Sequence, residues 1–203
     1  SLRRSLDEDN YVLVAIAGDT AVGYLVGSLP TAYLAGKLIK GIDIREHGSG
    51  NVGGSNVLST VSKWAFLPVV LTDAAKSLVP TLVALNTADS GWAATAAGTG
   101  AVVGHCWSVY LAFTGGRGMA TALGALLPVF PWALVWILGV HFVAAAFKLA
   151  ALGDILALVG LPLLALALGQ SPPVVATCAD ILVLVAAKRL HANSLPLPTD
   201  PSA

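Results

Sequence analysis

The sequence predicts an all-α membrane protein that crosses the bilayer several times, and three observations lead to this prediction. Hydrophobic residues make up 56% of the 203 residues and charged residues only 11%, whereas a soluble domain averages about 25% charged residues. The apolar residues gather in long runs separated by short polar loops. Several runs approach the roughly 20 residues that a helix needs to cross the hydrocarbon layer. This excludes a soluble enzyme, a disordered tail and a fibrous repeat, and predicts one membrane-embedded domain over residues 1–203, with tails at 1–10 and 196–203.

Seven candidate transmembrane helices follow one another along the chain. The first, residues 11–38, is long and is interrupted by Gly23, Gly27 and Pro30. The other six cover residues 61–85, 91–113, 120–131, 132–147, 149–168 and 172–187. The run 120–131 is short for a crossing, so a re-entrant segment is the alternative there.

Loop charges predict the direction of these helices. Lysine and arginine are absent from the second, fourth and sixth loops. They occur in or beside the first, third and fifth loops and after the last run, at Lys37, Lys40, Arg45, Lys63, Arg117, Lys148, Lys188 and Arg189. The positive-inside rule then places the C-terminus in the cytoplasm and the N-terminus outside. Arg3 and Arg4 are the exception, beside three acidic residues. No cleavable signal pattern is expected, because the apolar run is too long.

Charge and cysteine content exclude further classes. The net charge is zero, which gives no indication of nucleic-acid binding. Cys106 and Cys178 lie far apart in apolar runs and form neither a disulfide framework nor a metal motif. We therefore expect no metal and no cofactor.

The first loop is the most polar and glycine-rich part of the chain. Residues 40–56 read KGIDIREHGSGNVGGSN. Glycine lets a backbone take positive φ and approach a ligand closely, and successive N–H groups before a helix form an anion cradle. The loop contains Arg45, four glycines (Gly48, Gly50, Gly53, Gly54) and four polar side chains (Ser49, Asn51, Ser55, Asn56). These features favour a phosphate or carboxylate site over the alternative, a flexible linker.

The third loop has a related composition. Residues 113–124 read FTGGRGMATALG, with Gly115, Gly116 and Gly118 around Arg117. A guanidinium presents a planar fork that suits a phosphate. The alternative is a positively charged anchor in a simple turn. Because both glycine-rich loops are predicted on the cytoplasmic side, we expect them to face one site; neither is a Walker loop.

These motifs resemble the acyl-phosphate-dependent glycerol-3-phosphate acyltransferases of bacteria, the PlsY family. The resemblance lies in GSGNVGGSN after GIDIREH, in Gly104-His105, in GGRGMATALG, in Gly27-Ser28 with Pro30, and in LTDAAK at 71–76. It extends over about residues 23–193. Two glycine-rich motifs in the same order and separation are more specific than either alone.

The resemblance implies a function. Such enzymes transfer a fatty acyl group from acyl phosphate to the 1-hydroxyl of glycerol 3-phosphate, giving lysophosphatidic acid and phosphate, in phospholipid synthesis. The catalytic residues implied are Ser49, Asn51, Arg117 and Asn193. Those implied to bind substrate are Arg45, Gly48, Gly50, Gly53, Gly54, Ser55, Asn56, His105, Gly115, Gly116, Gly118 and His191. It also implies a monomer in contact with lipid in the bacterial inner membrane, with no nucleic acid partner.

The sequence departs from the family pattern at several positions. Ser59 stands where the family often has a basic residue, and Ala151 and Asp154 stand where it has two serines. His191 is one place away from the family's histidine. These departures leave open a divergent paralogue with another phosphate-bearing substrate, or a non-catalytic lipid-phosphate-binding subunit. A carrier is disfavoured, because no paired half-repeat is present.

Some polar residues lie inside the predicted helices. Asp73 and Lys76 are three residues apart on one face, where they can pair, and intramembrane charges are commonly functional; a purely structural pair is the alternative. For His105 the alternative is a core imidazole bonded to a backbone carbonyl. The family pattern does not require Asp19 or Asp180, and we expect a structural role for His141.

Overall fold

The computed structural model describes residues 2–88 and 90–194, and within these ranges the regular elements are helices and one isolated bridge between Ser108 and Thr114. The elements in chain order are α1 (Leu2–Gly27), α2 (Thr31–Lys40), η1 (Ile44–Glu46), α3 (Gly54–Asn56), η2 (Val57–Val61), α4 (Lys63–Thr87), α5 (Gly91–Cys106), η3 (Val109–Leu111), α6 (Met119–Leu126), α7 (Trp132–Ala146), α8 (Ala150–Ala167) and α9 (Pro172–Ser194). The all-α prediction is confirmed for the described part of the chain.

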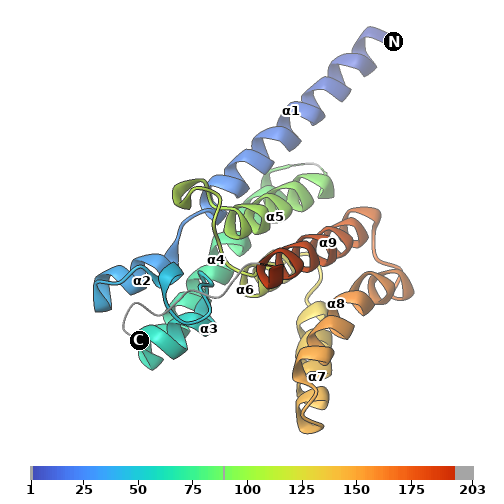
Figure 1. The fold of residues 1–203 in the computed structure, drawn as a ribbon. Helices are drawn as coiled ribbons and strands as arrows, with labels where there is room; N and C mark the ends of the chain where they lie inside the picture. Colours follow the sequence, from blue (N-terminus) through green and yellow to red (C-terminus); the bar gives the residue numbers. More distant parts are fainter. Residues whose placement is uncertain (1, 89, 195–203) are drawn as a thin grey trace.

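Helix α5 is the centre of the bundle and contacts α1, α4, α6 and α9 (Figure 1). Small residues permit its close approach to α1. Gly23 and Gly27 of α1 pack directly on the backbone of Ala97 and Ala101 of α5, where a Cβ on either glycine would clash. Glycine and alanine at such crossings let membrane helices pack by backbone contact.

The first predicted helix, residues 11–38, is in fact two helices. Helix α1 ends at Gly27, and α2 begins at Thr31 after Pro30. Proline has no N–H to continue a helical ladder, so the Gly27–Pro30 interruption separates two elements. The run 91–113 also ends early, at Cys106, and η3 follows as a separate turn. The other predicted runs correspond to α4, α6, α7, α8 and α9.

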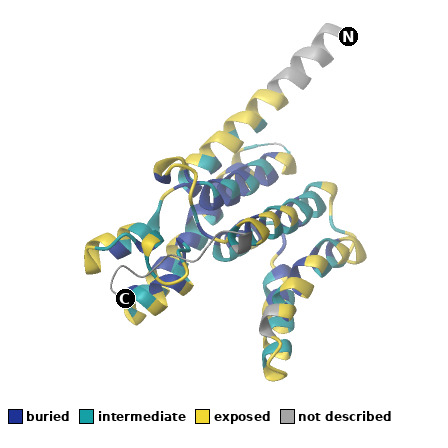
Figure 2. Ribbon diagram, in the orientation of Figure 1, coloured by how far each residue is buried: buried dark blue, intermediate teal, exposed yellow. Residues whose placement is uncertain are grey.

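The outer surface of the bundle is apolar. Leu13, Leu71, Phe142 and Leu163, on four different helices, are each more than half exposed. Figure 2 shows exposed positions along the outward faces of the helices and buried positions concentrated around α4, α5 and α6. Large exposed apolar surfaces of this kind indicate contact with lipid.

Two described helical stretches are long and apolar enough to cross a membrane by length and composition, Val12–Lys40 and Lys63–Thr87. Three shorter apolar helical stretches cover Met119–Val129, Trp132–Ala146 and Leu152–Ala167. The number of seven crossings stays a prediction.

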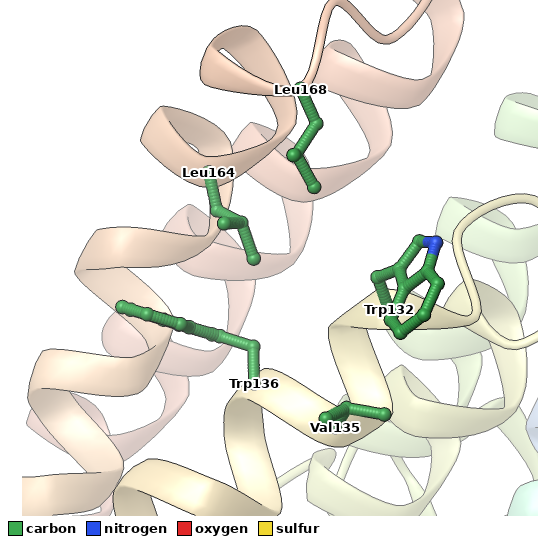
Figure 3. Close-up of a pocket in the computed structure, with 5 residues that line it drawn as sticks. All are labelled: Trp132, Val135, Trp136, Leu164 and Leu168. Atoms are coloured by element: carbon green, nitrogen blue, oxygen red, sulfur yellow. The ribbon is translucent and has the colours of Figure 1, made fainter.

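An apolar cavity of about 490 Å³ lies between α7 and the end of α8. Trp132, Val135 and Trp136 line one side, and Leu164 and Leu168 the other (Figure 3). The Trp136 indole N–H donates to the carbonyl of Ala157 at 2.9 Å, so the ring also ties the two helices together. None of the glycine-rich loop residues lines this cavity.

Candidate active site

The first glycine-rich loop is organised around the buried side chain of Asn56. Its Nδ2 lies within hydrogen-bonding distance of the carbonyls of Ile44, His47 and Asn51, at 3.0–3.1 Å. Its Oδ1 accepts from the Ser49 backbone N–H at 3.2 Å. The loop is therefore wrapped around Asn56, and the structure gives this residue, implied as a substrate contact, a structural role.

Backbone conformation explains the glycine at position 48. Gly48 has φ of +59°, and a Cβ there would run into Asn56 Oδ1 and Thr60. Glycine adopts positive φ without the penalty of other residues. The turn that presents Ser49 consequently depends on Gly48, as the sequence predicted.

Arg45 also forms contacts that hold the first loop. It forms a 2.7 Å ion pair with Asp43, lies over the Tyr33 ring and reaches Thr114 Oγ1 at 3.5 Å. The side-chain hydrogen bond from Arg45 lowers the pKa of Asp43 and raises that of Arg45. Arg45 thus links the first loop to the third.

The third loop turns back onto the end of α5. The N–H of Gly116 donates to the carbonyl of His105 at 3.0 Å. Gly115 sits against the carbonyls of His105 and Cys106, and Gly118, with φ of +86°, lies against Cys106 Sγ. The loop can approach α5 this closely because these positions have no Cβ.

The two glycine-rich loops meet at Gly116. A Cβ built on Gly116 would lie 2.7 Å from the carbonyl oxygen of Val52 and would clash with the His105 imidazole. Val52 and Gly115 line the same small cavity, of about 10 Å³, together with Lys76, His105 and Ser108. The predicted convergence of the two loops is therefore present in the structure.

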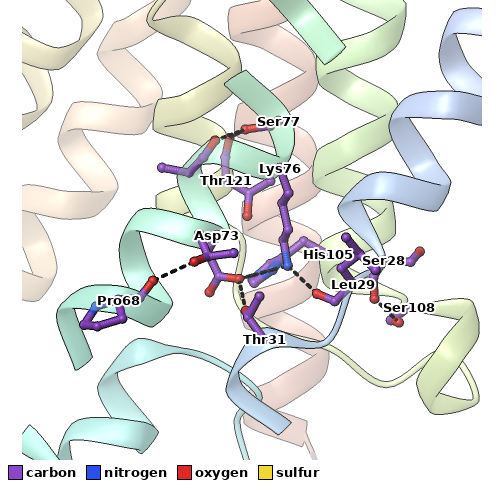
Figure 4. A network of polar contacts seen from close by, with 12 residues as sticks. Ser28, Leu29, Thr31, Pro68, Asp73, Lys76, Ser77, His105, Ser108 and Thr121 are labelled. Atoms are coloured by element: carbon purple, nitrogen blue, oxygen red, sulfur yellow. Dashed lines mark hydrogen bonds and ion pairs between the residues drawn. The ribbon is translucent and has the colours of Figure 1, made fainter. Parts of the chain in front are cut away.

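A buried polar cluster, shown in Figure 4, includes Lys76 and His105, which line the same small cavity as Val52 and Gly115. Lys76 Nζ is 2.9 Å from Asp73 Oδ1 and donates to the Leu29 carbonyl at 2.9 Å. Thr31 donates to the same Asp73 oxygen, and His105 Nδ1 is 3.7 Å from it. The predicted Asp73–Lys76 pair is confirmed, and it joins α4 to the segment between α1 and α2.

The other predicted site residues lie around the same loops. Ser49, Ser55 and Arg117 are exposed, Asn51 is half-buried and Gly53 is buried. No hydrogen bond or ion pair joins Arg117 to another residue in the ranges that the structure describes. His191 is exposed in the last turn of α9. The side chain of Asn193 lies outside the described part.

Sequence reasoning gave no role to several residues near the loops. Ser28 lines the small cavity, and its buried hydroxyl has no partner among the described residues. Ser108 donates to the Ser28 carbonyl at 2.6 Å. The family motif around Gly27-Ser28 was the only signal in the sequence that pointed to this position.

Asp154 and Ser59, two residues that depart from the family pattern, form contacts with their neighbours. The Asp154 carboxylate is 2.8 Å from His141 Nδ1 and 3.7 Å from the Arg189 guanidinium. It is thus bound by neighbours on α7 and α9, and His141 has the structural role expected of it. The hydroxyl of Ser59 turns back to its own chain and donates to the Asn56 carbonyl at 3.1 Å. Asp180 accepts from Thr99 at 3.1 Å.

Comparison with known proteins places this chain in a family. The family model described as glycerol-3-phosphate acyltransferase matches residues 19–195. A glycerol-3-phosphate acyltransferase of a Synechococcus species is 43% identical over 175 residues, covering 82% of this chain and 83% of the relative. That of Geobacter sulfurreducens is 40% identical over 172 residues, covering 83% and 87%.

Two solved structures are also similar to this chain. The crystal structure of PlsY, an integral membrane glycerol 3-phosphate acyltransferase, in its glycerol 3-phosphate form has a TM-score of 0.79 and 30% identity, covering 88% of this chain and 90% of that one. Its lysophosphatidic acid form has a TM-score of 0.75 and 28% identity, covering 91% and 96%. This chain therefore belongs to the glycerol-3-phosphate acyltransferase family of integral membrane proteins.

Proposed function

We propose that this protein transfers a fatty acyl group from acyl phosphate to the 1-hydroxyl of glycerol 3-phosphate in phospholipid synthesis. The bond between the acyl carbon and the phosphate oxygen breaks, and an ester bond forms to the hydroxyl oxygen. The hydroxyl proton leaves with inorganic phosphate, and the other product is 1-acylglycerol 3-phosphate. The observation that carries the proposal is the contact of the two glycine-rich loops at Gly116 and Val52.

The chemistry requires two anions to be held together. Acyl phosphate is an activated mixed anhydride with a good leaving group, so positioning and charge stabilisation provide most of the catalysis. In this proposal Ser49 and Asn51 contact one phosphate, and Arg117 contacts the other. Both Ser49 and Arg117 are exposed at the loops, where substrates have access to them.

A covalent enzyme intermediate is not required by this arrangement. The nearest thiol to the third loop, Cys106, is fully buried and packs against Gly118. His105 is buried behind Gly116. The substrate's own phosphate is the base in this proposal, and the loops bind and orient the reactants.

The membrane arrangement is part of the proposal. Seven crossings, an outward N-terminus and a cytoplasmic C-terminus would place both glycine-rich loops at the inner face of a bacterial inner membrane, with the protein acting as a monomer in contact with lipid. The cytoplasmic side is where a soluble phosphate ester is available. The apolar outer faces of the helices support the membrane location.

The experiment is an assay of the purified protein in detergent with acyl phosphate and glycerol 3-phosphate. Phosphate release and 1-acylglycerol 3-phosphate, identified by mass spectrometry, should appear only when both substrates are present. Replacing acyl phosphate with acyl-coenzyme A tests the donor, and replacing glycerol 3-phosphate with other phosphate esters tests for a divergent paralogue. Lipid-phosphate binding without turnover with any pair would indicate a non-catalytic subunit.

A further inference from the structure

A buried lysine on α9 lies close to the third loop and has no hydrogen-bond or ion-pair partner among the described residues. Lys188 is 5% exposed, and its ammonium lies 5.2 Å from the ring centre of Trp107. No residue in the described ranges accepts a hydrogen bond or forms an ion pair with it. A buried charge is costly when no opposite charge or acceptor compensates for it, and the indole ring covers only one side of this ammonium.

The position of Lys188 relates it to the candidate active site. Val185, three residues before Lys188 on α9, packs against Gly118 of the third loop. Its Cγ2 would lie 3.5 Å from a Cβ built on Gly118. The Trp107 ring that Lys188 contacts directly follows Cys106 at the end of α5, and Gly118 of the same loop lies against Cys106 Sγ. Lys188 therefore approaches the turn of Gly115–Gly118 from the α9 side.

Comparison with Lys76 shows why this charge stands out. Lys76, which is buried like Lys188, pairs with Asp73 and donates to the Leu29 carbonyl. Lys76 thus has an opposite charge and an acceptor beside it. Lys188 has neither among the described residues, only the Trp107 ring.

We infer that Lys188 binds a phosphate oxygen of a substrate held at the third loop, next to Arg117. An ammonium has three donors, so it can contact the Trp107 ring and still donate to a ligand. The ligand chemistry is a phosphate group, from acyl phosphate or from glycerol 3-phosphate. The inference rests on the proposed function in taking these as the two substrates.

The test compares Lys188→Met and Lys188→Gln, which remove the charge, with Lys188→Arg, which keeps it. Lys63→Met is the matched control, because Lys63 is an exposed lysine at the start of α4. Steady-state kinetics give kcat and the KM of each substrate, and inhibition and thermal stabilisation by inorganic phosphate give its affinity without turnover.

The neutral variants should raise the KM of one substrate and weaken inorganic phosphate binding about tenfold or more, the loss expected for one charge-assisted hydrogen bond. The substrate whose KM rises is the one that Lys188 contacts. Lys188→Arg should stay within about threefold of the parent, and Lys63→Met should match it. Phosphate binding that is equal in the parent and the neutral variants would overturn the inference while leaving the proposed function in place.

The unfolding temperature of the Lys188 variants provides a second test of the inference. If the ammonium has no partner in the fold, the neutral variants should unfold at the same temperature as the parent, or a higher one, in the absence of phosphate. A large loss of stability in both would show that Lys188 is a structural residue and would overturn the inference. Weakened phosphate binding in a protein that transfers no acyl group would support the inference and reject the proposed function.

Discussion

The carbonyl oxygen of Val52 lies against the α-carbon of Gly116, with no room for a methyl group between them. One residue belongs to the first glycine-rich loop and the other to the third. Their contact brings Ser49, Asn51 and Arg117 to the same part of the molecule. The absence of a side chain at Gly116 therefore permits the contact between the two loops.

Gly116→Ala should reduce turnover about 100-fold, the scale of an ångström-sized misplacement of catalytic groups. The added methyl would press on the Val52 carbonyl and the His105 ring. The measurement is kcat in the two-substrate assay. Gly139→Ala is the control, because no atom lies within 4 Å of a Cβ at that helical position. Equal rates in both variants would show that the loop contact is not needed for activity.

Asn56→Ala should destabilise the protein by about 3 kcal/mol, because it leaves buried carbonyl groups of the first loop without their donor. Faster hydrogen exchange at residues 44–51 should accompany this loss. The matched control is Asn86→Ala, which removes an exposed side chain bonded to the Leu82 carbonyl and should change stability by less than about 0.5 kcal/mol. An unaltered exchange rate in Asn56→Ala would mean that the loop does not depend on this side chain.

Ser49→Ala and Arg117→Ala should each lower turnover about tenfold or more, the effect of losing one contact to an anionic reactant. Arg117→Lys should retain more activity, since the point charge is kept while the planar fork is lost. Ser59→Ala is the control for Ser49→Ala, because among the described residues the Ser59 hydroxyl donates to the carbonyls of Ser55 and Asn56 in its own helical turn. Full activity in both alanine variants would place the site elsewhere.

Lys76→Met should destabilise the protein by about 3–5 kcal/mol, because Asp73 is left as a buried charge without its partner. The double variant Asp73→Asn/Lys76→Met should recover much of this loss, since the asparagine oxygen can still accept from Thr31. Thermal unfolding in detergent measures both. A double variant no more stable than Lys76→Met alone would contradict a simple charge-pair role.

Asp43→Asn should lower the stability of the protein by an amount that is the same at every pH between 5 and 8. The hydrogen bond from Arg45 lowers the pKa of Asp43 below its ordinary value of 3.8. For a carboxyl with a lowered pKa, the stabilising contribution is complete above the ordinary value and is lost only as the pH falls through the lower one. The difference in unfolding temperature between the parent and Asp43→Asn measures it. A difference that changes between pH 5 and pH 8 would be inconsistent with this assignment.

The sequence determined the helical class and most element boundaries. Apolar runs and the prolines and glycines between them specify α4, α7 and α8 closely, because these are local properties of the chain. Helix α6 ends at Leu126 and not at 131 as predicted, and α9 continues to Ser194 and not only to 187. The two glycine-rich loops were also identifiable from composition. Gly48 and Gly118 have positive φ, which favours glycine. At Gly116 the neighbouring atoms leave no room for a side chain.

The contacts of the polar side chains depend on how the helices pack, which the sequence does not specify locally. Asn56 and Ser49 look alike as loop donors in the sequence, yet Asn56 points inward to four backbone groups whereas Ser49 is exposed. Likewise Lys76 is neutralised by Asp73, and Lys188 faces the Trp107 ring. Hydrogen bonds and ion pairs depend on distances between residues that are remote along the chain, and packing of α4, α5 and α9 sets those distances.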